Sequence, residues 1–121
     1  MLIRAYELME ELLVKIRARD DKRFELLRTC KFISDQTFQE NGCINSYLAQ
    51  DNDNENIIIL KQQWTKRSFL NDYFRSDHFS ALLGAMKWLG QSYEIRINES
   101  SGTEGIEAVQ DARAKENVND L

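Results

Sequence analysis

His78 is the only histidine in the 121-residue chain, and it lies two residues after Ser76, where an apolar helical pattern begins. An imidazole at this position could act as a general base towards a phenol, or donate a hydrogen bond at the rim of a pocket. Ser76 has the type and place of a helix N-cap, so His78 could equally be a partly exposed residue of the first helical turn. We take His78 as the candidate catalytic residue. A lone histidine with no neighbouring cysteine or second histidine does not make a metal site.

Composition argues against several classes of partner. The formal net charge is −4, whereas a general nucleic-acid binder usually carries a strongly basic face. No apolar run approaches the roughly 20 residues that span a bilayer, and residues 1–16 lack the uninterrupted apolar region of a signal peptide. Cys30 and Cys43 fit reduced thiols in a core. We expect a cytoplasmic protein that uses no metal and no cofactor and binds neither nucleic acid nor membrane.

Two hydrophobic periods divide the chain into strands and helices. Alternation of apolar and polar residues predicts strands over 12–19, 43–50 and 92–98, and three consecutive isoleucines favour another over 57–64. A helical period predicts helices over about 22–40 and 67–89, the second with a break at Ser76. In the first helix we expect the buried stripe to consist of Phe24, Leu27, Cys30, Ile33 and Phe38.

The order strand, helix, strand, strand, helix, strand is the split ferredoxin-like βαββαβ arrangement, an α+β fold with an antiparallel sheet. Both helices would cover one face of that sheet. The strand at 57–64 is apolar on both faces at its start, so the other face needs a cover too. A homodimer in which two sheets close face to face would supply it.

Three segments follow from this arrangement. We assign residues 11–98 to the domain and residues 1–10 to an N-terminal extension. Residues 99–121 form a tail that could make a short helix, because Ile106, Val109 and several alanines share a helical period. This tail would either dock on a partner subunit or stay mobile.

Within this series of elements the chain resembles the antibiotic biosynthesis monooxygenase (ABM) family. The resemblance is carried by NGCINSY, IIILKQQW and SDHFSALLGAMKWL, and covers roughly residues 11–98. Its marks are Gly42-Cys43 at the start of the second strand, Trp64 at the end of the third, and Ser76, His78 and Phe79 at the start of the last helix. The family consists of dimeric α+β barrels. It includes cofactor-independent oxygenases of polycyclic phenols, quinol oxygenases and haem-degrading enzymes.

The resemblance implies an aromatic substrate held between sheet and helices. Trp64 would either stack on that substrate or fill the core between sheet and helix. Phenol-oxidising members carry an asparagine four residues before this tryptophan and a tyrosine six residues after it, where this chain has Leu60 and Leu70. Asn45, Tyr47 and Gln62 are the candidates to replace those polar groups, with Asn45 and Tyr47 on one face of their strand.

Haem binding is not expected from the same comparison. Haem-degrading members pair the tryptophan with a histidine one turn into the last helix, and here that position is Leu83. We therefore expect an ABM-like monooxygenase that oxidises a small aromatic or quinol-like substrate with O2 and no cofactor. The alternative is a non-catalytic dimer on the same fold, which binds a ligand or another protein.

Overall fold

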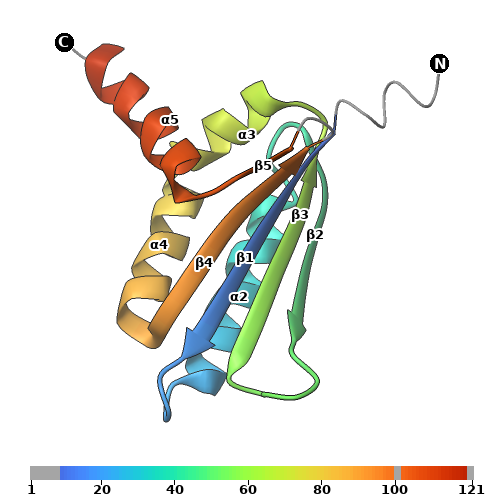
Figure 1. The fold of residues 1–121 in the computed structure, drawn as a ribbon, viewed down its shortest axis with the longest axis vertical. Coiled ribbons are helices and arrows are strands. Elements are labelled where there is room, and N and C mark those ends of the chain that lie inside the picture. Colours follow the sequence, from blue (N-terminus) through green and yellow to red (C-terminus); the bar gives the residue numbers. More distant parts are fainter. Residues whose placement is uncertain (1–8, 100–101, 120–121) are drawn as a thin grey trace.

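A computed structural model of the chain describes residues 9–99 and 102–119. Its centre is an antiparallel sheet in the order β2-β3-β1-β4-β5 (Figure 1). The strands are β1 (Glu10–Ala18), β2 (Cys43–Gln50), β3 (Ile57–Trp64), β4 (Gly90–Glu99) and β5 (Gly102–Glu104). The helices are α2 (Arg23–Thr37), α3 (Arg67–Phe74), α4 (Asp77–Leu89) and α5 (Ile106–Asn119). The first four strands with α2, α3 and α4 confirm the predicted ferredoxin-like α+β fold. Within the described ranges, no helix is long and apolar enough to cross a membrane.

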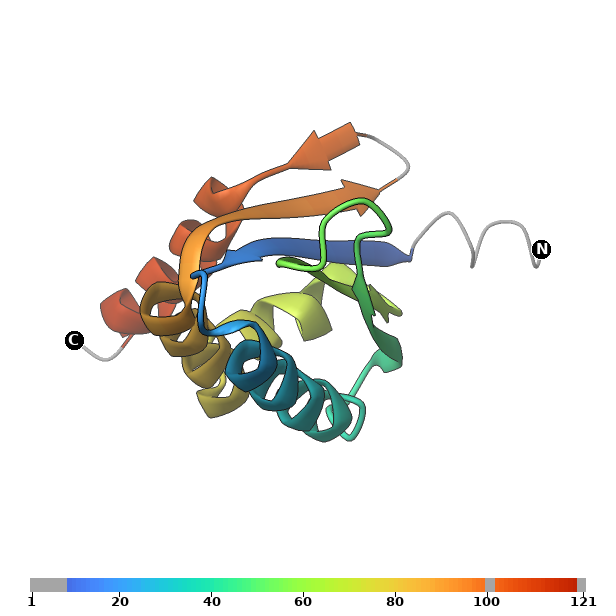
Figure 2. The ribbon, with the colours of Figure 1, turned by 90° about the horizontal axis from the view of Figure 1, so that it is seen from below.

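Alternation along the two central strands decides which face of the sheet is buried. Val14 of β1 pairs with Leu60 of β3, and both side chains are fully buried on the side that faces the helices. Figure 2 shows α2, α3 and α4 on this side of the sheet, with no helix over the opposite face. On that open face Lys15 pairs with Ile59, and Ile59 is only half-buried. The chain therefore covers one face of its sheet and leaves an apolar strip on the other.

The buried side of α2 differs from the predicted stripe. Cys30 and Ile33 are buried as expected, but Phe24 is 72% and Phe38 51% exposed, and Leu27 is half-buried. The error has a geometric cause: steps of three residues drift by about 60° each around an α-helix, so a stripe built on them crosses from one side to the other. The residues that face the core recur at steps of three and four, and they are Leu26, Cys30, Ile33, Ser34 and Thr37.

The C-terminal segment adds a strand and a helix to the predicted fold. β5 pairs with β4, and α5 lies against α3 (Figure 1). The side chain of Arg113 donates to the carbonyl of Phe74 at 2.6 Å, and that of Arg75 donates to the carbonyl of Ala112 at 3.3 Å. The sequence predicts that this tail docks on a partner subunit or stays mobile. The structure packs it on its own chain, and docking on a partner subunit stays a prediction. Of the predicted extension at residues 1–10, residues 1–8 lie outside the described residues.

The turn between α2 and β2 depends on Gly42. Its φ angle is +86°, in the left-handed region that side chains with a Cβ rarely adopt. The Gly42 carbonyl accepts a hydrogen bond from the amide of Thr65 at 2.9 Å, which joins this turn to the end of β3. A Cβ added to Gly42 would overlap the side chain of Phe69 on α3. The glycine therefore allows α3 to lie close to the start of β2.

Gly42→Ala should lower the free energy of unfolding by roughly 2–4 kcal/mol, because the new methyl group meets both backbone strain and the Phe69 ring. Gly84→Ala is the matched control, since a Cβ on Gly84 of α4 would meet nothing within 4 Å. We expect Gly84→Ala to be neutral or to add ~0.5–1 kcal/mol through helix propensity. Urea unfolding of both variants checks this, and equal stabilities would contradict it.

Candidate functional site

A buried aromatic cluster occupies the space between the end of β3 and the short helix α3. Trp64 is fully buried and Tyr73 is 1% exposed. Their rings stack with centroids 4.9 Å apart and planes inclined by 29°. Phe79, from the first turn of α4, meets Tyr73 edge to face at 5.2 Å. The three rings form an aromatic cluster inside the core, at the end of the sheet where β3 is followed by α3.

Hydrogen bonds connect the two stacked rings through a buried amide. The indole Nε1 of Trp64 donates to Oε1 of Gln62 at 3.2 Å, and Nε2 of Gln62 donates to the Tyr73 hydroxyl at 3.4 Å. The hydroxyl oxygens of Thr37 and Tyr73 lie 3.4 Å apart, and Thr37 also donates to the carbonyl of Ile33 at 2.8 Å. Across the part of the chain that the structure describes, every buried side-chain nitrogen and oxygen has a partner. The core thus contains a continuous polar chain from α2 to β3.

The Tyr73 hydroxyl remains protonated in the neutral pH range. Burial raises its pKa to about 12, although the hydrogen bonds from Thr37 and Gln62 act in the opposite direction. The nearby Cys43 and Glu40 add to the increase in pKa, because a second negative charge would be repelled. Tyr73 can therefore serve as a neutral hydrogen-bond donor or acceptor in this cluster, and not as a base.

The residues predicted to bind substrate do not form one site. Trp64 and Gln62 alternate with Gln63 along β3, so both face the helices. Asn45 and Tyr47 lie on the opposite, open face of the sheet. The side chain of Asn45 donates to Oε1 of Gln63 at 2.8 Å, and Tyr47 is 51% exposed. The sheet therefore separates the two pairs.

His78 lies at the start of α4, as the sequence predicts. Ser76 is the N-cap, and its hydroxyl accepts from the amide of Phe79 at 3.1 Å. The imidazole Nδ1 lies 2.8 Å from Oε1 of Glu40, and the His78 side chain is 41% exposed. The charge of Glu40 also acts on the pKa of Tyr73. His78 therefore lies near the rim of the aromatic cluster. It is hydrogen-bonded to Glu40, whose charge raises the pKa of Tyr73 in that cluster.

Polar groups lie two or three residues after the two positions where this chain has leucine in place of the asparagine and tyrosine of phenol-oxidising members. Leu60 is followed on the same face of β3 by Gln62, and Leu70 is followed one helical turn later by Tyr73. All four side chains are fully or almost fully buried. A polar residue two or three places after a predicted site position, on the same face, is the signal by which Tyr73 could have been found.

Thr37 could have been found in a similar way. It follows Cys30 by seven residues, which is two turns of α2, and with Ser34 it is one of two polar residues on the buried face of this helix. Its hydroxyl bonds the carbonyl of Ile33, four residues earlier, and so remains satisfied inside the core.

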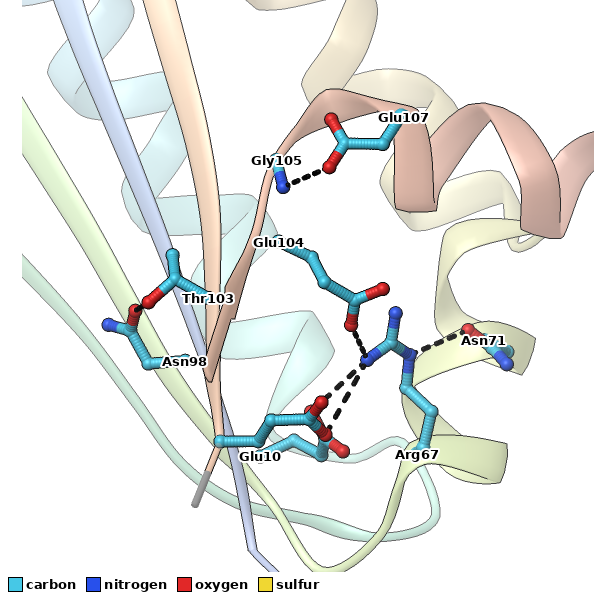
Figure 3. A network of polar contacts seen from close by, with 9 residues as sticks. Glu10, Arg67, Asn71, Asn98, Thr103, Glu104, Gly105 and Glu107 are labelled. Carbon is cyan, nitrogen blue, oxygen red and sulfur yellow. Dashed lines mark hydrogen bonds and ion pairs between the residues drawn. The ribbon is translucent and has the colours of Figure 1, made fainter. Parts of the chain in front are cut away.

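A second polar cluster adjoins the first at the end of β1. Glu10, which is only 5% exposed, pairs directly with Trp64 across the two strands, so both side chains lie on the helix-facing side. Figure 3 shows Arg67 of α3 reaching towards Glu10 and Glu104. The guanidinium Nη1 lies 3.3 Å from Glu10, 2.5 Å from Glu104 and 3.9 Å from Glu99. One arginine thus joins three carboxylates from β1, β4 and β5.

The surroundings of Glu10 move its protonation into the neutral pH range. Burial is the main cause that raises its pKa from 4.5 to about 7, followed by the hydrogen bond with Glu99 and the charge of that carboxylate. Glu104 also raises the pKa, whereas Arg67 lowers it. Glu10 is the residue that sequence reasoning missed most clearly. It was left in the N-terminal extension, although it continues the alternation of Leu12 and Val14 by two residues.

These features define a ferredoxin-like α+β domain with a buried aromatic and polar cluster at one end of its sheet. The sequence profile of the family described as antibiotic biosynthesis monooxygenase matches residues 9–84, more than half of the chain. The chain therefore belongs to this family, and the resemblance seen in its sequence is confirmed. No curated protein sequence matches the chain.

Several solved structures share the fold. A conserved protein of Methanosarcina mazei is 24% identical, with a TM-score of 0.74 over 82% of this chain and 98% of its own. A protein of Pseudomonas aeruginosa is 21% identical, with a TM-score of 0.70 over 76% of this chain and 93% of its own. An antibiotic biosynthesis monooxygenase is 15% identical, with a TM-score of 0.68 over 74% of this chain and 96% of its own. At these identities the likeness shows the fold alone.

Gln62→Leu should lower the free energy of unfolding by ~1–3 kcal/mol, because the Trp64 N–H and the Tyr73 hydroxyl lose the amide that both contact. Gln63→Leu is the matched control: the same change, one residue later, on the open face. We expect this control to alter stability by no more than about 0.5 kcal/mol. Thermal and urea unfolding of both variants give the comparison. A cost at Gln62 no larger than at Gln63 would show that the buried hydrogen bonds contribute little.

Proposed function

We propose that the protein is an ABM-type monooxygenase that binds a small planar phenol or quinol between its sheet and helices and oxidises it with O2, without a cofactor. The observation that carries this proposal is the hydrogen-bonded aromatic pair of Trp64 and Tyr73, linked through Gln62. A planar ring suits a stacking wall, and a phenolic oxygen suits neighbouring N–H and O–H donors.

Each group of this cluster has a role in the proposed reaction. The substrate ring stacks on the indole of Trp64, in place of the Tyr73 ring. The buried amide of Gln62 then stabilises the charge that develops on the substrate oxygen when its proton leaves. The deprotonated, electron-rich ring adds to O2 through carbon, and the peroxide anion that forms takes a proton from solvent. The resulting hydroperoxide loses water and leaves one oxygen atom on the ring as a carbonyl. Neither a metal nor a flavin is required for this sequence of bond changes.

Access for the substrate requires that Tyr73 move away from Trp64. Tyr73 lies on α3, a helix of eight residues whose N-cap, Lys66, makes no side-chain capping hydrogen bond. A short helix without a capping side chain is easier to displace than the sheet against which it packs. In the proposed reaction α3 shifts and the strand β3, with Trp64 and Gln62, stays in place.

His78 is proposed as a rim residue that donates a hydrogen bond to the substrate, held in position by Glu40. Its 41% exposed side chain suits the mouth of the site better than its interior. Asn45 and Tyr47 belong to the open face and are proposed to act at the subunit interface and not on the substrate. Gln62 and Trp64 remain proposed substrate-binding residues.

One observation favours a second function, a non-catalytic dimer that binds a ligand or another protein. Trp64, Gln62 and Tyr73 are almost completely buried, and their polar atoms already have partners within the chain. Such a cluster can stabilise the fold without ever meeting a substrate. Turnover measurements distinguish the two functions.

A homodimer is proposed for either function, because the open face of the sheet is partly apolar. Ile57 and Ile59 of β3 lie on this face, half-buried, next to the exposed ring of Tyr47 on β2. Lys15 and Arg17 line a hollow here together with Glu94. Charges of both signs around an apolar strip suit a self-complementary interface, in which each patch meets its own copy across a twofold axis.

Oxygen uptake with a panel of quinols and anthrones should detect turnover by the wild type. Trp64→Phe keeps a ring but loses the indole N–H, so kcat/KM should fall roughly 10- to 100-fold. Trp88→Phe is the control, because Trp88 is 80% exposed on α4. His78→Ala should raise KM and leave kcat within about twofold, as expected for a rim residue.

Two results would contradict this proposal in different ways. No turnover by the wild type across the panel would favour the non-catalytic dimer. Equal kcat/KM in the Trp64 and Trp88 variants would remove Trp64 from the substrate site, even if the protein is an oxygenase.

Light scattering at micromolar concentration should give twice the chain mass of 14.2 kDa. Ile59→Asp places a charge in the apolar strip of the open face and should produce a monomer. Phe32→Asp is the control, since Phe32 is 65% exposed on α2, on the far side of the helices from the sheet. A monomeric wild type, or a dimer that Phe32→Asp breaks and Ile59→Asp does not, would place the interface elsewhere or remove it.

A further inference from the structure

We propose that Glu10 is the general base that takes the proton from the phenolic substrate, an inference that rests on the proposed function. The position of Glu10 carries it. Glu10 and Trp64 form a directly opposed pair on neighbouring strands, and their side chains lie on the same face. The Cβ atoms of such a pair are about 4.5–5.5 Å apart, so the longer glutamate side chain reaches the oxygen of a ring stacked on the indole.

A buried carboxyl group at this position needs an explanation, because it costs stability. The other helix-facing residues of β1 are apolar, and they are Leu12, Val14, Ile16 and Ala18. Glu10, only 5% exposed, shares its surroundings with two further carboxylates, Glu99 and Glu104, and one cation, Arg67. Three acids around one arginine leave an excess of negative charge, which an apolar residue at position 10 would reduce. Acids and bases in active sites are held in environments of this kind.

The proton transfer balances within these groups. The O–H bond of the phenol breaks, and its electron pair stays on the substrate oxygen as the phenolate. The proton forms a new O–H bond on a carboxylate oxygen of Glu10, whose negative charge is thereby removed. Gln62 donates a hydrogen bond to the new phenolate, as in the proposed reaction, and Arg67 remains with the other two carboxylates.

The cluster also offers the proton a way out to solvent. The side chains are exposed to increasing degrees along the series Glu10 (5%), Glu99 (28%) and Glu104 (39%). Glu10 and Glu99 are hydrogen-bonded to each other, and Glu104 shares Arg67 with both. A proton accepted by Glu10 can therefore pass to Glu99 and leave the protein from the outer end of the cluster.

The charged groups around Glu10 set the direction of the pH dependence. They are Glu99 from β4, Glu104 from β5 and Arg67 from α3, while β3 contributes the uncharged Trp64. Burial and the two carboxylates raise the pKa of Glu10 to about 7, and the charge of Arg67 acts in the opposite direction. A base acts only when deprotonated, so kcat/KM should rise with pH and level off above a midpoint near 7.

Glu10→Gln should lower kcat/KM about 100-fold or more and abolish the rise near neutral pH, as expected when a general base is lost. Glu11→Gln is the matched control: the same change one residue later, on the open face, where Glu11 pairs with Lys61 at 3.4 Å. It should keep the wild-type pH profile. Unchanged turnover and profile in Glu10→Gln would overturn the role of Glu10 and leave the oxygenase proposal standing.

A second readout needs no turnover. Carbon-13 NMR of labelled glutamate side chains should show one carboxyl that titrates near pH 7 in the wild type and in Glu11→Gln, and is absent from Glu10→Gln. Addition of 2-naphthol, a phenol, should lower that midpoint by half a unit or more, because its O–H bonds the charged carboxylate. Naphthalene, which lacks the hydroxyl, should leave the midpoint unchanged.

These outcomes separate the two proposals. Suppose that 2-naphthol shifts the titration midpoint of Glu10 but the protein oxidises none of the substrates. Glu10 then remains the hydrogen-bond acceptor of a phenol-binding site, and the oxygenase proposal is rejected. A Glu10 carboxyl that titrates below pH 5, or whose midpoint ignores saturating 2-naphthol, would overturn the inference. So would a failure of 2-naphthol to bind.

Discussion

The buried amide of Gln62 is the contact on which the arrangement of the core depends. Its oxygen accepts a hydrogen bond from the indole N–H of Trp64, and its nitrogen donates one to the hydroxyl of Tyr73. A single side chain of β3 thus provides partners for the polar atoms of two aromatic residues. Inside an apolar layer, polar groups without partners cost ~1–3 kcal/mol each. The position of α3 over the sheet is therefore restricted to placements that bring the Tyr73 hydroxyl to this amide. The aromatic stack, the approach of Phe79 and the close contact of Phe69 with Gly42 follow from that placement.

Arg67 extends the same restriction to the far end of the chain. It is the first residue of α3, and it meets carboxylates that belong to β1, β4 and β5 (Figure 3). Its contacts bring the start of the domain and its C-terminal strand to the end of the sheet where Trp64 lies. The polar groups that could act on a substrate are thus gathered at one end of the sheet by two side chains, Gln62 and Arg67. This concentration supports a functional role more strongly than any one residue does.

Local pattern was sufficient for most of the fold. The strands at 43–50 and 57–64 have the predicted bounds, because alternation marks the first, consecutive isoleucines mark the second, and Asn and Asp mark the turn between them. The break at Ser76 was predictable from its capping hydroxyl. The stripe of α2 was not, since apolar residues at steps of three suggested a face that helix geometry does not allow. The prediction assigned Phe24 and Phe38 to the core by their apolar character, and both are exposed.

The site was harder to predict because it depends on which residues of different elements share a face. Asn45 and Tyr47 are polar and near Trp64 in the sheet, but they point to the other side of it. Glu10 continues the alternation of β1, but its burial comes from α3, β4 and β5, which are distant in sequence. Glu10 is buried beside Arg67, which is distant in sequence. The residues next to Glu10 in the chain therefore do not distinguish it from a surface glutamate. The contribution of the tail, through Glu104, was not predictable for the same reason.

Ligand binding between the sheet and the helices, beside Trp64, can be tested directly by NMR. The chain has two tryptophans, the buried Trp64 and the exposed Trp88, so a nitrogen-15 NMR spectrum contains two indole N–H signals, one of which serves as an internal control. Titration with a quinol should shift the Trp64 signal in a saturable manner and leave that of Trp88 in place. A stationary Trp64 signal, with saturable shifts confined to Lys15, Ile57 and Ile59 of the open face, would contradict the account.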